Sequence, residues 1–250
     1  MDNNILQRDL TEQLPGNIVM EPASLRTFLA NVFSYMTLAL VISGVMAWWF
    51  GHDPELMGHL LKQDPATGQI SQSVLGWVVM LAPLGLVFLM GGMVNKLSST
   101  ALMAIFLVYS AVTGISLSYI FLAYTAQAIY TVFFMTAGLF SVMAIAGYTT
   151  KTDLSKLGSI LFIGLIGIII ASVINLFLGS ETMDYIISII GVVIFTGLTA
   201  YDMQKLKGIG QQVATGSEAA EKMALMGALS LYLDFINLFL MLLRLFGRRD

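Results

Sequence analysis

Long apolar segments that recur along the whole chain constrain its fold more than any other feature of the sequence. Each is close to the length of about 20 helical residues that crosses a hydrocarbon core about 30 Å thick. A helix also satisfies its backbone hydrogen bonds internally, as lipid requires. The sequence therefore predicts an all-α polytopic membrane protein with seven transmembrane helices. The predicted helices are residues 27–50, 74–94, 101–124, 129–148, 157–178, 184–204 and 224–246.

The composition excludes a water-soluble globule. Of the 250 residues, 57% are hydrophobic and only 11% are charged, whereas soluble proteins carry roughly 25% charged residues. The net charge of -3 and the lack of a basic patch give no sign of nucleic-acid binding. Because the chain has no cysteine, disulfides, thiol catalysis and thiolate metal sites are excluded as well.

The N-terminal residues 1–26 are polar and lack the basic start of a signal peptide. We therefore interpret Thr27–Phe50 as an uncleaved first helix of a transmembrane domain, 27–246, which a short tail, 247–250, follows. Eight Lys and Arg residues lie on the N-terminal side of the predicted topology and four on the other. This bias predicts a cytoplasmic N-terminal segment and an external C-terminus. The discordant residues are Arg244, Arg248 and Arg249.

A carboxylate, Asp234, lies near the middle of the last apolar segment. An uncompensated charge there costs about 2.5–3.5 kcal/mol on insertion scales, so we expect a partner for it. Steps of three and four residues place Asp234 on one helical face with small and polar residues. This polar stripe consists of Gly227, Ser230, Asp234, Asn237, Met241 and Arg244. We therefore expect the last helix to be central, with the stripe facing protein or water and Arg244 reaching the interface.

A second acid, Asp202, closes the preceding apolar segment, on one face with Gly191, Phe195 and Thr199. Consecutive helices usually pack together, so the two carboxyl groups can meet near the cytoplasmic side. Adjacent carboxyl groups do not both ionise cheaply; they share a proton and titrate in two separate steps. Two simpler interpretations stay open. In the first, Asp202 is a helix-terminal acid at the interface. In the second, Asp234 is a structural residue that is satisfied by Tyr, Ser or a backbone carbonyl.

Other motifs carry less weight. His52 and His59 lie in a solvent loop without a ligand-spaced set, which argues against a zinc site. The glycine-rich KGIGQQVATG follows a membrane helix and not a strand, so it does not predict a dinucleotide loop. Small residues at helical spacing, Ser110, Gly114 and Ser118, predict close packing between helices.

Three motifs resemble the Bax inhibitor (transmembrane Bax inhibitor motif) family, in particular its bacterial YetJ-like members. The run LSLYLDFINLFLMLLRLFG resembles the last helix of that family, TAYDMQ the end of its sixth helix, and TGISLSYIF its third. The resemblance covers nearly the whole chain after Arg26. It implies six outer helices that enclose the seventh, in a pH-sensitive calcium leak whose sensor is a pair of membrane aspartates.

By this resemblance, Asp202 and Asp234 are the pH-sensing pair and a weak, transient path for calcium. The family also has an arginine latch at the cytoplasmic end of the second helix, where this chain has Lys96. Lysine lacks the planar guanidinium that binds a carboxylate through two hydrogen bonds. Lys96 is therefore a latch candidate that departs from the family pattern.

The resulting expectation is a calcium leak channel of a bacterial inner membrane, and not an enzyme. While the pair shares a proton, the last helix seals against the sixth; deprotonation adds a charge, and repulsion separates them. Calcium takes about 6–8 oxygen ligands, more than the two aspartates offer with Thr199 and Asn237, which favours passage over storage. Ser230 and Arg244 complete the supporting stripe. We expect no cofactor; the expected partners are lipid, calcium ions and protons.

Three alternatives remain. A proton-coupled cation exchanger would use the same residues, and a regulatory protein would bind a membrane protease or another membrane partner. An intramembrane protease also needs two carboxyl groups that share a proton. However, Asp234 lies in LYLDF and not in GxGD, and no PAL motif follows it.

Overall fold

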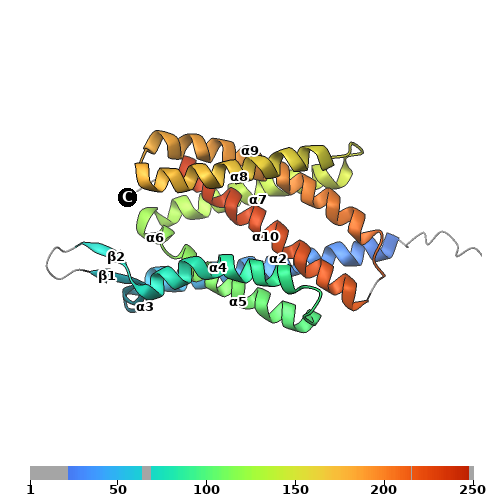
Figure 1. The fold of residues 1–250 in the computed structure, drawn as a ribbon, viewed down its shortest axis with the longest axis horizontal. Coiled ribbons are helices and arrows are strands. Elements are labelled where there is room, and N and C mark those ends of the chain that lie inside the picture. The colour runs from blue at the N-terminus through green and yellow to red at the C-terminus, as the bar shows by residue number, and fades with distance from the viewer. Residues whose placement is uncertain (1–21, 64–68, 215, 248–250) are drawn as a thin grey trace, which may run out of the picture.

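The computed structural model describes residues 22–63, 69–214 and 216–247, and it confirms the predicted all-helical membrane fold (Figure 1). Seven helical spans in this part of the chain are long and apolar enough to cross a membrane. The described residues do not include most of the polar N-terminal segment. They also do not include Arg248 and Arg249 of the tail. The elements are α2 (Pro22–His52), α3 (Pro54–Leu60), β1 (Leu61–Gln63), β2 (Ile70–Gln72), α4 (Val74–Met93), α5 (Ser99–Leu117), α6 (Ile120–Ala123), α7 (Ala126–Thr149), α8 (Ser155–Leu178), α9 (Glu181–Gly210) and α10 (Glu218–Phe246).

The last two long helices extend farther than the apolar pattern predicts. Helix α9 continues to Gly210, and α10 already begins at Glu218, so much of the predicted connection at 205–223 is helical. Ser217 accounts for the start of α10, because its hydroxyl accepts a hydrogen bond from Ala220 N–H at 3.1 Å as an N-cap. We call the end of the bundle that holds this connection and the start of α2 the inner end, following the predicted topology.

The opposite, outer end holds structure that the sequence did not reveal. Residues 51–73 were expected to form a polar loop, but they contain α3 and the antiparallel hairpin of β1 and β2, in which Leu61 pairs with Gln72. Three half-exposed tryptophans, Trp48, Trp49 and Trp77, lie next to this region. Tryptophan is enriched where a membrane meets water, so these side chains mark the outer boundary of the lipid-facing surface.

Helix α10 is the central element of the bundle, as predicted. In Figure 1 it runs between α8 and α9 on one side and α4 and α5 on the other. In its most apolar stretch 67% of the residues are buried, compared with 6% for α8. Helices α2, α5, α7 and α9 pack against α10, whereas α4 packs mainly on α5 and α8 mainly on α9. Four helices therefore line the seventh, and two occupy a second layer.

The apolar core consists of two clusters that meet at the level of the two acids. On α10 the inner cluster extends to Phe235 and the outer cluster begins at Leu238. On α9 the outer cluster extends to Leu198, and the inner cluster begins at Met203. Between these limits, or directly beside them, lie the polar residues Thr199, Asp202, Asp234 and Asn237. A polar layer thus divides the apolar interior.

We expect Gly147→Ala to destabilise the protein more than Gly227→Ala. A methyl group at Gly147 would collide with the backbone of Ala200 on α9, whereas one at Gly227 would meet the end of the Leu206 side chain. Overpacking costs about 1–3 kcal/mol, and a side-chain end moves more easily than a backbone. Thermal unfolding of both purified variants in one detergent measures the difference. Equal unfolding temperatures would contradict the close contact between α7 and α9.

Candidate functional site

Two glycine contacts determine how α9 and α10 align. Gly191 lies against Met241 near the outer end, and Gly227 lies against Leu206 near the inner end. The helices are antiparallel, so this register places Asp202 level with Ser230. Asp234 then lies level with Thr199, about one helical turn, or about 5.4 Å, farther from the inner end. The structure therefore brings the polar stripe of α10 against the predicted face of α9 that holds Thr199 and Asp202.

Asp234 is almost completely buried, with an exposed fraction of 6%. Its Oδ2 atom has no hydrogen-bond partner among the residues that the structure describes. The nearby polar side chains donate within their own helices: Thr199 Oγ1 to Phe195 O and Asn237 Nδ2 to Leu233 O, both at 2.8 Å. For this oxygen, the interpretation in which Tyr, Ser or a backbone carbonyl satisfies Asp234 thus finds no support.

Asp202 lies inside α9 and not at its end, because the helix continues to Gly210. Along the helix axis, Gly210 lies about 12 Å beyond Asp202. Ser230 on α10 and Lys205 on α9 both act on the charge of the Asp202 carboxyl group. The Asp202 charge in turn acts on Asp234. The two predicted acids are therefore electrostatic neighbours.

Lys96 is not brought to this pair. It lies in the turn between α4 and α5, where its side chain is exposed. Within the described part of the chain, the ion pairs are Lys222 with Glu218 and Arg244 with Asp184. The latch role of Lys96 stays a prediction, and Lys205 is a cation near Asp202 that the sequence analysis did not single out.

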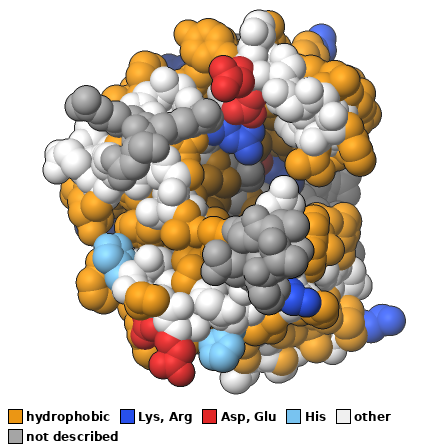
Figure 2. Space-filling view, turned by 90° about the vertical axis from the view of Figure 1, so that its left-hand side faces the viewer, with side chains coloured by type: hydrophobic (Ala, Val, Ile, Leu, Met, Phe, Trp, Pro, Cys, Tyr) orange, Lys and Arg blue, Asp and Glu red, His pale blue; other side chains and the backbone are white. Residues whose placement is uncertain are grey.

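Arg244 lies at the outer end of the stripe and has a partner that the sequence analysis missed. Its Nη1 atom is 3.2 Å from Asp184 Oδ1 on α9. Both side chains line a hollow of about 590 Å³ together with Asn175 and Glu181. Figure 2 shows the outer end, with acidic and basic side chains at the edge of a hollow. Arg244 thus joins the outer ends of α9 and α10.

Comparison with known proteins identifies the family. The family model described as inhibitor of apoptosis-promoting Bax1 matches residues 25–250. The chain belongs to this Bax inhibitor family. The match includes both aspartates, the polar stripe and all but the first residues of α2.

Relatives in the Bax inhibitor family cover nearly the full length of the chain. The inner membrane protein YbhL of Escherichia coli (strain K12) is 44% identical over 234 residues, 93% of this chain and 96% of that protein. An uncharacterized protein of Borreliella burgdorferi is 45% identical over 222 residues, 89% of this chain and 92% of that protein. These similarities, with the seven spans, confirm the predicted location as an integral inner membrane protein.

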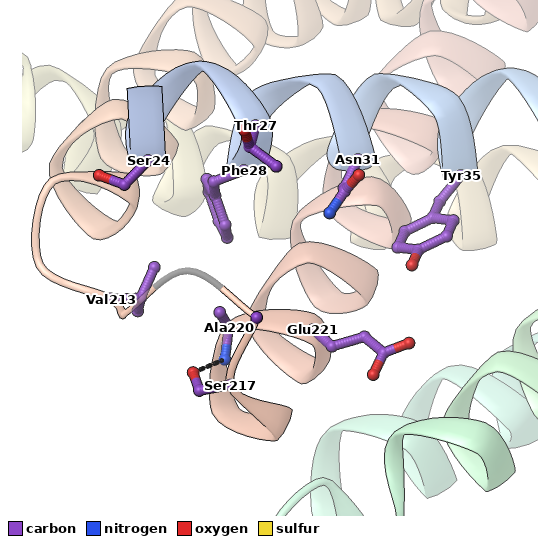
Figure 3. A pocket seen from close by; sticks show the side chains of 10 residues that line it. Ser24, Thr27, Phe28, Asn31, Tyr35, Val213, Ser217, Ala220 and Glu221 are labelled. Carbon is purple, nitrogen blue, oxygen red and sulfur yellow. Dashed lines mark hydrogen bonds between the residues drawn. The ribbon is translucent and has the colours of Figure 1, made fainter. Parts of the chain in front are cut away.

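The described residues contain no group of three or more His, Asp or Glu side chains that could hold a metal ion. His52 Nδ1 lies 2.9 Å from Trp48 O, and the His52 ring packs edge-on against Phe121. At the inner end, a pocket of about 140 Å³ between α2 and α10 has Glu221 as its one acidic lining residue (Figure 3).

A buried hydroxyl cluster joins α10 to α2 and α5. Ser43 Oγ lies 2.6 Å from the Tyr232 hydroxyl and 2.7 Å from Ser110 O. All three residues are at most 2% exposed. Gly114 permits this close approach, because any side chain there would collide with the backbone of Ser43. The small residues on α5 predicted close packing, but nothing in the sequence pattern indicated that Ser43 and Tyr232 would meet.

We expect Ser43→Ala to destabilise the protein more than Tyr232→Phe. Tyr232→Phe leaves Ser43 able to donate to a carbonyl oxygen, so the variant loses one hydrogen bond, worth about 0.5–1.5 kcal/mol. Ser43→Ala leaves a buried phenol without its acceptor, which costs about 1–3 kcal/mol. Thermal unfolding in detergent measures the order, and a less stable Tyr232→Phe variant would contradict it.

Proposed function

We propose that this protein is a pH-sensitive calcium leak channel that Asp202 and Asp234 gate. The observation that supports this proposal most is the environment of Asp234. Its buried Oδ2 lacks a hydrogen-bond partner in the described part of the chain, and Asp202 acts on its charge. Ionisable groups inside a membrane are costly and are usually functional. Membership of the Bax inhibitor family adds support.

The charge of the pair supplies the gating energy. With one proton on the pair, only one charge is present, and α9 and α10 stay in contact. Without it, the pair carries two negative charges, and two unit charges that are about 5 Å apart repel by about 3 kcal/mol at an effective dielectric constant of about 20. That energy shifts a two-state equilibrium by roughly a hundredfold. Calcium flux is therefore expected to increase as the pH rises.

The oxygen atoms of the site suit brief passage of calcium. The two carboxyl groups, the Thr199 hydroxyl and the Asn237 side-chain carbonyl provide fewer than the about 6–8 oxygens that calcium takes. Water must supply the remaining ligands. A site that completes its coordination with water binds weakly, and weak binding lets an ion leave as readily as it enters.

We expect Asp234→Asn and Asp202→Asn each to abolish most of the increase in calcium flux with pH. In either variant the pair retains one carboxyl group, so it can no longer carry two charges. Flux into liposomes that contain purified protein is measured from acidic to alkaline pH. The control is Asp153→Asn at the inner surface, where hydrogen bonds from Ser155 hold the pKa of the Asp153 carboxyl group below its usual range. Wild-type pH curves in both membrane variants would refute the proposal.

Lys205→Gln should shift the flux curve to higher pH, because removal of a nearby positive charge makes a second negative charge at Asp202 harder to form. Lys205 lies on the same helix as Asp202 and acts on its charge, whereas Lys96 lies in the α4–α5 turn. Lys96→Gln is the matched comparison in the same liposome assay. A shift with Lys96→Gln alone would favour Lys96 as the latch over Lys205.

A further inference from the structure

The direction of the hydrogen bonds at Ser43 follows from its single hydroxyl hydrogen. Ser43 Oγ lies 2.9 Å from Ala39 O and 2.7 Å from Ser110 O. Both are carbonyl oxygens, which only accept, so the Ser43 hydrogen goes to one of them. The Tyr232 hydroxyl, 2.6 Å away, must therefore donate to Ser43 Oγ. The shorter of the two contacts, to Ser110 O, extends a relay of two hydroxyl groups from α10 through α2 to α5.

Tyr232 and Asp234 lie on nearly opposite faces of α10. Two residues correspond to a rotation of about 200° in an α-helix. Tyr232 points to α2 and α5, where its ring is 5.5 Å from that of Tyr109. Asp234 points to α9, where Asp202 acts on it. A contact that holds Tyr232 in place therefore also determines the direction in which Asp234 points.

We propose that Tyr232 is a positioning residue for Asp234. Its hydroxyl holds α10 in the rotation that turns Asp234 toward Asp202, and this role rests on the proposed function of that pair. Ring packing alone limits the position of Tyr232 but provides no directed contact to α2. The directed contact is the bond to Ser43, a residue with an exposed fraction of 2%, where water does not compete for it.

The charged and titratable groups around the relay are few. From α5, Tyr109 faces Tyr232; from α9, Asp202 acts on Asp234 and Lys205 acts on Asp202. Ser43 on α2 is neutral. A variant that removes only the Tyr232 hydroxyl therefore leaves every charge of the pair in place, so that a changed flux reports on position and not on charge.

The test measures helix position and flux in the same variants. Because the chain contains no cysteine, Met223→Cys on α10 and Leu157→Cys on α8, both 43% exposed, accept spin labels without background. Helix α8 packs on α9, so the distance between the labels reports how α10 lies relative to that unit. The variants are Tyr232→Phe and Ser43→Ala, with Tyr109→Phe as the matched control that removes a neighbouring phenol.

We expect Tyr232→Phe and Ser43→Ala to shift or broaden the distance distribution in liposomes, and Tyr109→Phe to leave it unchanged. Calcium flux at acidic pH should rise by roughly three- to fifteenfold, as expected for the loss of one hydrogen bond between membrane helices. An unchanged distance in both relay variants overturns the proposal. A changed distance with wild-type flux also overturns it, provided that Asp234→Asn alters flux. If Asp234→Asn leaves flux unchanged, the leak function fails, and the distances alone then decide whether the relay positions α10.

Discussion

An ionisable side chain inside a hydrocarbon layer has to be surrounded by other protein groups, and the arrangement of the bundle follows from this requirement at Asp234. The polar face of α10 is turned toward α9, which supplies Thr199 at the same depth and Asp202 about one helical turn nearer the inner end. The remaining faces of α10 are covered by α2, α5 and α7. Helices α4 and α8 carry no such side chain and lie mostly against lipid. The central place of α10 is therefore a consequence of its polar stripe.

The features that could be predicted from the sequence are those that depend on one helix at a time. Segment length revealed the seven spans, and the period of the helix revealed the stripe around Asp234. Pairs between distant helices were not predictable, because no local pattern says which helices pack together. Ser43 with Tyr232 and Asp184 with Arg244 are such pairs. The polar ends of α9 and α10 were also missed. The run of apolar residues that predicts a span ends at the lipid boundary, whereas a capped helix continues into water.

Both faces of α10 carry polar contacts, but their chemistry differs. On the α9 side, Asp234 is ionisable and has a carboxyl oxygen without a partner among the described residues. On the α2 side, Tyr232 has a neutral hydroxyl with a defined acceptor. In the proposed leak, the charge of the first contact varies with the proton concentration, whereas the second contact stays neutral. In that proposal, α10 turns about its α2 side when the charge on its α9 side changes.

The division of the apolar interior has a consequence for how an ion crosses. The polar layer of Thr199, Asp202, Asp234 and Asn237 has one dry cluster on each side. Apolar constrictions exclude water and ions until they widen, so in the proposed leak an ion has to pass two such constrictions in series, one on each side of the polar layer. If the inner one widens first, water and protons reach the acids while the outer one still holds back calcium. The proposed leak then responds to the pH at the inner end before the membrane becomes permeable.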